Sequence, residues 1–123
     1  MIADQFIPTL IALEDAIKRN TAADDQTTVA TVSVVAAIRV LVLLLDAGFV
    51  PPDFVVDPNG EIEMNWMRDR GRWFSLTVAS NGDLIYAWIL NGNHGNGVSA
   101  FDRVTLPLDL TSKLSAVTCE TTK

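Results

Sequence analysis

The stretch 72–90, RWFSLTVASNGDLIYAWIL, constrains the fold most, because two apolar-rich runs flank an Asn-Gly pair. Asn-Gly between such runs is a strong hairpin signal, since a type I′ turn needs positive φ at both central residues. A two-residue turn at Asn81-Gly82 pairs Ser80 with Asp83. This register predicts a core face. Its members are Phe74, Leu76, Val78, Ile85, Ala87 and Ile89.

The preceding run, residues 61–68, agrees with the same inside face. A three-residue loop, Asp69-Arg70-Gly71, with Gly71 in the left-handed region, is a common hairpin connection. A shift of one residue in this register would bury Glu63 and Asn65. The two turns therefore predict one antiparallel meander. The run adds three residues to its core face: Ile62, Met64 and Trp66.

The opposite face of the predicted meander carries aromatic, acidic and polar side chains. Trp and Tyr supply rigid amphipathic area and are enriched at interaction hot spots. We therefore predict a partner-binding surface there. An alternative stays open, in which the C-terminal segment or the N-terminal helix folds over part of this face. The predicted binding residues are Trp73, Tyr86, Trp88, Glu61, Glu63, Asn65 and Met67.

Apolar residues at helical spacing predict two helices before the sheet. Residues 2–19 form the first, with Pro8 favouring a regular start near itself. Residues 29–47 are the most apolar segment, with Gly48 as the expected C′ residue. The segment is short for a bilayer and has Arg39 at its centre, so we expect a core helix and no membrane contact. An all-round apolar helix is hard to cover in a small domain, which favours a homodimer through helix 29–47.

The remaining segments complete an α+β domain spanning residues 1–123. Prolines exclude helix from 49–60, which is predicted to be an extended connector. Residues 91–97, NGNHGNG, are expected to form a glycine-rich loop, and 98–106 a fourth strand. Residues 106–117 are expected to end in a short helix, with three residues facing inward: Leu110, Leu114 and Val117. The predicted fold packs two N-terminal helices on an antiparallel meander of three to four strands, followed by that short C-terminal helix.

Charge and composition limit the partner. The net charge of −6 argues against direct nucleic-acid binding, which needs a basic stripe, and it favours a basic protein partner. Cys119 is the only cysteine, so no intrachain disulfide forms. His94 has no second ligand at metal-binding spacing, and nothing marks a pocket around the acidic residues. We therefore expect no metal, no cofactor and no enzymatic activity. The N-terminus lacks a basic signal-peptide region, which indicates a cytoplasmic protein.

One segment, VDPNGEIEMNW (56–66), follows the pattern V-x-P-(D/N)-G-x-I-x-x-x-W after a helix and a Pro-rich connector. Over about Ser33 to Trp88 this order resembles a loose group of small bacterial and phage proteins of unknown function. The unusually apolar helix and the long Asn/Gly loop depart from that group. The resemblance implies an α+β fold and a bacterial or phage setting, and it carries over no active-site residue. The firmest matches are Pro58, Gly60, Ile62 and Trp66.

These observations favour a non-enzymatic protein-binding module. The first interpretation is a phage- or mobile-element-encoded inhibitor of a host defence complex, an anti-CRISPR-like protein acting in the bacterial cytoplasm. The alternative is an antitoxin or immunity protein that masks a basic toxin. A third hypothesis is a small hydrolase that uses Glu61, Glu63 or His94.

Overall fold

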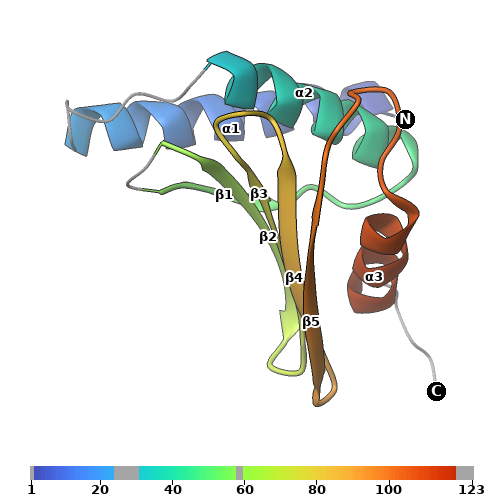
Figure 1. Cartoon of the computed structure of the whole chain (residues 1–123). Helices are drawn as coiled ribbons and strands as arrows, with labels where there is room; N and C mark the ends of the chain where they lie inside the picture. Colours follow the sequence, from blue (N-terminus) through green and yellow to red (C-terminus); the bar gives the residue numbers. More distant parts are fainter. Residues whose placement is uncertain (1, 24–30, 58–59, 119–123) are drawn as a thin grey trace.

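The computed structural model describes residues 2–23, 31–57 and 60–118. Within these residues the chain forms three helices and a five-stranded antiparallel sheet (Figure 1). The α+β class is therefore confirmed, with one strand more than expected. Pro58, Cys119 and the expected helix start at residues 29–30 lie outside the described residues. The elements are α1 (Ile2–Ala23), α2 (Thr31–Asp46), β1 (Asp53–Val56), β2 (Ile62–Asp69), β3 (Arg72–Val78), β4 (Leu84–Leu90), β5 (Asn93–Ser99) and α3 (Leu108–Thr118).

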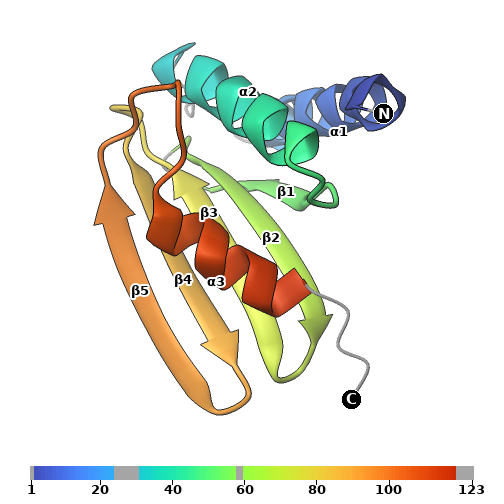
Figure 2. The same cartoon turned by 90° about the vertical axis from the view of Figure 1, so that its right-hand side faces the viewer.

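The sheet follows chain order, β1-β2-β3-β4-β5, and α2 and α3 pack on the same face of it. Helix α1 packs against α2 and β1. Figure 2 shows α3 crossing the sheet below α2, and Figure 1 shows that no described element covers the opposite face. The molecule therefore has one covered sheet face and one open sheet face, and these names are kept below.

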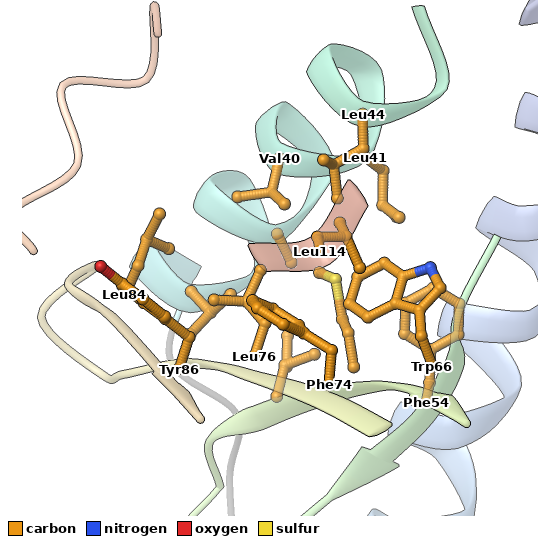
Figure 3. Close-up of a cluster of buried hydrophobic side chains, with 14 of the residues drawn as sticks. Val40, Leu41, Leu44, Phe54, Trp66, Phe74, Leu76, Leu84, Tyr86 and Leu114 are labelled. Atoms are coloured by element: carbon orange, nitrogen blue, oxygen red, sulfur yellow. The ribbon is translucent and has the colours of Figure 1, made fainter. Parts of the chain in front are cut away.

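The hydrophobic core lies between the covered face and the helices (Figure 3). Helix α3 turns three fully buried side chains inward, as predicted: Leu110, Leu114 and Val117. Helix α2 contributes Ala36, Ala37, Val40, Leu41 and Leu44. The sheet contributes Phe54, Ile62, Met64, Trp66, Phe74, Leu76, Val78, Leu84 and Tyr86.

The register of β2 on β3 is the predicted one. Ile62 lies opposite Val78, and Trp66 lies opposite Phe74. The connection itself differs, because Gly71 is not in the left-handed region and Asp69 already pairs with Arg72. An irregularity between Met67 and Asp69 absorbs the extra residue. The two strands keep the predicted register from Ile62 to Met67, on the side of the bulge away from the turn. The predicted core residues of both strands are therefore correct.

The predicted register of β3 on β4 is wrong by one residue. Leu76 lies opposite Tyr86, and Val78 lies opposite Leu84. The turn has three residues, 80–82, and Ala79 pairs with Asp83 by donating its N–H to the Asp83 carbonyl at 2.9 Å. Side chains alternate between faces, so this single residue moves all of β4 to the other face. The residues wrongly assigned to the core are Ile85, Ala87 and Ile89, and those placed on the covered face instead are Leu84, Tyr86 and Trp88.

The loop conformation explains the error. Only Gly82 has a positive φ in this turn, at 90°, so the turn is a type I turn followed by a left-handed glycine and not type I′. Gly82 N–H donates to the Ala79 carbonyl at 2.8 Å, and the Asn81 side chain accepts from Asp83 N–H at 2.9 Å. Asn81 thus supports the turn through its side chain and does not need a left-handed backbone.

A type I′ turn does occur, one hairpin later. Asn91 and Gly92 have φ of 51° and 93°, and they join Leu90 to Asn93. The predicted glycine-rich loop 91–97 is therefore wrong, because most of it is strand β5. The fourth strand predicted at 98–106 is also wrong, since only its first two residues belong to β5. Part of the predicted connector forms the short strand β1.

The end of α2 agrees with the sequence, whereas the extent of α1 does not. Helix α1 runs from Ile2 through Pro8 to Ala23, so the predictions of a regular start near Pro8 and of an end at residue 19 are both wrong. Helix α2 ends at Asp46, and Gly48 beyond it has a φ of 96°, with Phe49 N–H donating to the Leu44 carbonyl at 3.0 Å. This is a Schellman end with Gly48 at C′, as predicted. Among the described helices, none combines the length and the apolar content needed to cross a bilayer.

Candidate interaction surface

The open sheet face is built from the outward side chains of all five strands. Each strand contributes every second residue, because successive side chains point to opposite faces. The pairing aligns these residues into three rows across the sheet. The rows are Val55, Glu63, Thr77, Ile85 and Val98; then Asp53, Asn65, Ser75, Ala87 and Asn96; then Met67, Trp73, Ile89 and His94.

Large apolar side chains on this face are exposed on four of its strands. Met67 is 72% exposed and Val98 69%, followed by Val55 at 48%, Ile85 at 40% and Ile89 at 39%. Trp73, on the central strand, is half-buried between Met67 and Ile89. These apolar side chains lie in the first and third rows, with the mostly polar second row between them. Exposed apolar side chains gathered on one face, with polar residues beside them, favour an interaction site.

The second row is mostly polar, and two of its polar groups are shielded from solvent. Ser75 is buried and donates its hydroxyl to Glu63 Oε2 at 3.2 Å. Asn65 Oδ1 is shielded from solvent and has no hydrogen-bond partner among the described residues. An unsatisfied buried acceptor costs about 1–3 kcal/mol.

Charged residues lie at the two ends of the face. Asp53 and Glu63 lie toward β1, whereas the turn between β2 and β3 carries Arg70, and β3 begins with Arg72. Arg72 forms an ion pair with Asp69 at 3.2 Å. The Gly71 N–H donated to Asp69 at 2.9 Å, helped by Arg72, lowers the pKa of that carboxyl. The surface therefore has apolar side chains in its first and third rows, a mostly polar second row, acidic residues toward β1 and a basic residue, Arg70, at the β2–β3 turn.

Four of the seven predicted binding residues meet on this face: Glu63, Asn65, Met67 and Trp73. Glu61 precedes β2, where its backbone N–H donates to Asp57 Oδ1 at 3.0 Å. The placement of Tyr86 and Trp88 is wrong, because both belong to the covered face. Ile85, Ala87 and Ile89 take their places, and the signal that could have found them is the three-residue turn ending in Gly82.

Tyr86 and Trp88 anchor α3 to the sheet. Phe74, Tyr86 and Trp88 stack in sequence, with ring centroids 6.1 Å and 6.2 Å apart. The Tyr86 hydroxyl donates to Asp109 Oδ2 at 3.0 Å, and Lys113 Nζ lies 5.2 Å from the centroid of the Trp88 ring. Burial raises the pKa of Tyr86, and the bond to Asp109 raises it further. The C-terminal helix thus covers these aromatic rings.

The same rings explain the glycines of β5. Gly95 pairs with Trp88, and Gly97 pairs with Tyr86. A Cβ atom on Gly97 would lie 2.6 Å from Tyr86 Cζ, and one on Gly95 would overlap the Trp88 ring even more closely. The two rings lie flat across β5, so the strand can carry no side chain at these positions. A glycine-rich sequence is therefore compatible with a strand here.

A second apolar surface, the helix groove, lies between α1 and α2. It encloses about 500 Å³, and Ile7 and Ile11 beside it are 61% and 53% exposed. The Glu14–Lys18 ion pair borders it, at 3.7 Å. The homodimer predicted through helix 29–47 would use this groove, and it stays a prediction. The remaining lining residues are Leu10, Leu13, Ile17, Val34 and Ile38.

The residues considered for hydrolysis are not brought together. Glu63 lies on β2 and His94 on β5, with β3 and β4 between them, so three strand spacings of about 4.8 Å separate their backbones. Within the described part of the chain, no group of three or more His, Cys, Asp or Glu side chains is arranged to hold a metal ion. No known protein family, curated protein sequence or solved structure matches this chain.

Proposed function

We propose that this protein is a non-enzymatic protein-binding module whose partner contacts the open sheet face. The observation that carries the proposal is that four strands of the sheet each expose a large apolar side chain on the open face. These side chains are Val55 on β1, Met67 on β2, Ile85 on β4 and Val98 on β5. Their transfer from water to a partner surface supplies the favourable free energy of association. Trp73 between Met67 and Ile89 adds the kind of aromatic anchor that dominates hot spots.

The charge distribution supports a basic partner. The chain carries a net charge of −6, and Asp53 and Glu63 lie beside the exposed apolar residues of the open sheet face. Such a field accelerates the association of a basic protein at low ionic strength more than it changes the final affinity. Within this proposal we place an inhibitor of a host defence complex first and an antitoxin masking a basic toxin second. The two differ in the partner, a large effector complex in one and a small toxin in the other.

A capture experiment with two paired variants tests the surface. The protein is immobilised and exposed to bacterial lysates that contain either a CRISPR effector or a basic toxin. The open-face variant is Met67→Asp with Ile89→Asp, and the matched control, with two exposed apolar residues of the helix groove, is Ile7→Asp with Ile11→Asp. We expect the wild type and the groove variant to retain the same partner and the open-face variant to lose it.

The single substitution Trp73→Ala measures the hot spot. We expect it to weaken binding of the captured partner by about 2 kcal/mol, roughly a thirtyfold change in Kd. Unfolding curves of all variants must match the wild type for the comparison to count. Undiminished binding by the open-face variant, with loss in the groove variant, would move the site to the helices.

A further inference from the structure

The two edges of the sheet differ in their protection. Strand β1 is four residues long, follows Pro51-Pro52 and has α1 packed on it. Strand β5 is seven residues long and pairs with β4 along its full length without a bulge. It contains no proline and no charged Lys, Arg, Asp or Glu, and Figure 2 shows no described element beside its outer edge. An unprotected edge strand is a template for pairing with another strand, so proteins usually protect it with charged residues, proline, a bulge or a covering element. Within the described part of the chain, strand β5 has none of these.

The backbone groups on this edge belong to His94, Asn96 and Val98. The type I′ turn is closed by a hydrogen-bonded pair, Leu90 with Asn93. Because hydrogen-bonded and non-hydrogen-bonded pairs alternate, the next residues along β5 point their N–H and C=O groups away from β4. No hydrogen bond among the described residues uses these outward groups.

We propose that β5 pairs antiparallel with β5 of a second copy of this chain, about a two-fold axis at Asn96. In this register Asn96 lies opposite its own counterpart, and His94 lies opposite Val98 of the other copy. All the facing residues are those with outward backbone groups, so their three pairs form about six backbone hydrogen bonds. The side chains of directly opposed residues share a face, so the two open sheet faces become one continuous surface.

The strand favours a second copy over a foreign strand because its features are symmetric about Asn96. Gly95 and Gly97 flank that residue, so Gly95 of one copy lies opposite Gly97 of the other. The Trp88 and Tyr86 rings, which lie over these glycines, therefore meet no side chain from the second strand. Two chains of net charge −6 repel each other, but they would meet along a strand without acidic residues. Val98, which is 69% exposed, would gain His94 of the second copy as its neighbour.

Cysteine cross-linking tests the register, in a Cys119→Ser background because Cys119 is the only cysteine. Opposed residues of a hydrogen-bonded antiparallel pair have Cα atoms about 5.5 Å apart, within disulfide range. Asn96→Cys should therefore form a reducible dimer under mild oxidation. His94→Cys is the matched control on the same strand and face, because its counterpart would be about 14 Å away. His94→Cys mixed with Val98→Cys should cross-link, although neither alone does.

Light scattering tests the assembly itself. The wild type should have twice the chain mass of 13.4 kDa. Asn96→Lys places two like charges at the axis and should give a folded monomer, whereas Ser80→Lys in the exposed β3–β4 turn should stay dimeric. A monomeric wild type overturns the proposal. So does a dimer that survives Asn96→Lys, or equal cross-linking of Asn96→Cys and His94→Cys. None of these readouts needs the binding partner, so their failure is separable from failure of the proposed function.

Discussion

At the scale of single residues, Gly95 and Gly97 show how a large side chain on one strand can require glycine on the neighbouring strand. Both suggest a loop, because glycine weakens a strand and has no side chain to pack. Their places in β5 follow from Trp88 and Tyr86, whose rings occupy the space that a Cβ atom would need. The requirement for glycine therefore comes from steric exclusion and not from a positive φ.

Replacement of Gly95 by Ala tests this steric requirement. The added methyl group overlaps the Trp88 ring, so the ring or β5 must move. We expect a loss of about 1–3 kcal/mol in the free energy of unfolding, as in other overpacked sites. Asn93→Ala, on the same strand with an exposed side chain and outside the three pairs of the proposed dimer, should change it by less than about 0.5 kcal/mol. Urea unfolding measures both, and equal values would contradict the clash.

The titration of Tyr86 tests its burial under α3. Burial and then Asp109 raise its pKa, so the folded protein holds the phenolic proton more tightly than the unfolded chain does. This contribution to stability is fully present below the unfolded pKa of about 10 and is lost as the pH rises through the folded pKa. Tyr86 is the only tyrosine, so tyrosinate absorbance reports it directly.

We expect this absorbance to appear at higher pH in the folded protein than in urea. Asp109→Asn should bring the two curves closer without merging them, because burial is the larger cause. Tyr86→Phe should remove its part of the alkaline loss of stability. Coincident curves in the folded and unfolded wild type would show that the hydroxyl is not buried.

At the scale of elements, the hairpin turns decide which face each strand presents. Asn81-Gly82 and Asn91-Gly92 have the same two residues, yet the first belongs to a three-residue turn and the second forms a two-residue turn. Asn tolerates both backbone regions, so the dipeptide alone does not select between them. In the first turn Gly82 lies against Val32 of α2, with a Cβ position 3.2 Å from Val32 Cγ1. The surroundings of that turn therefore include a helix that is distant in the sequence.

The end of α2 offers a local test at this scale. Gly48 has a φ of 96°, and nothing lies within 4 Å of its Cβ position, so only backbone strain opposes a side chain there. Gly48→Ala should cost about 1 kcal/mol. Gly48→Asn should cost less, since Asn enters the left-handed region more readily. Thermal unfolding ranks the variants, and an Ala variant as stable as the Asn variant would argue against this cap.

At the scale of the whole molecule, one layer of helices covers only one face of the sheet. Leu84 is fully buried on the covered face, whereas Ile89, on the same strand, is 39% exposed on the open face. Leu84→Ala should therefore cost about 2–5 kcal/mol. Ile89→Ala should cost about 1 kcal/mol or less. Denaturant unfolding measures both costs. A larger loss for Ile89→Ala than for Leu84→Ala would contradict the observed register and support the one expected from a two-residue turn at Asn81-Gly82.

The sequence by itself determined that two N-terminal helices and a short C-terminal helix form, although not the extent of α1. It also determined the Gly48 cap, the pairing of β2 with β3 and the inward residues of α3. These features depend on local periodicity and on capping chemistry, which neighbouring residues specify. Four residues of the candidate surface followed correctly from the same pairing: Glu63, Asn65, Met67 and Trp73.

Only the tertiary structure decided which face β4 buries and that 93–99 is a strand. Both faces of β4 are apolar, so hydrophobic pattern cannot choose between Leu84, Tyr86 and Trp88 on one side and Ile85, Ala87 and Ile89 on the other. The choice comes from contacts distant in sequence: Asp109 and Lys113 of α3 hold Tyr86 and Trp88, and those rings need the glycines of β5 beneath them. Side-chain contacts between segments far apart in the chain carry this information, and no local pattern contains it.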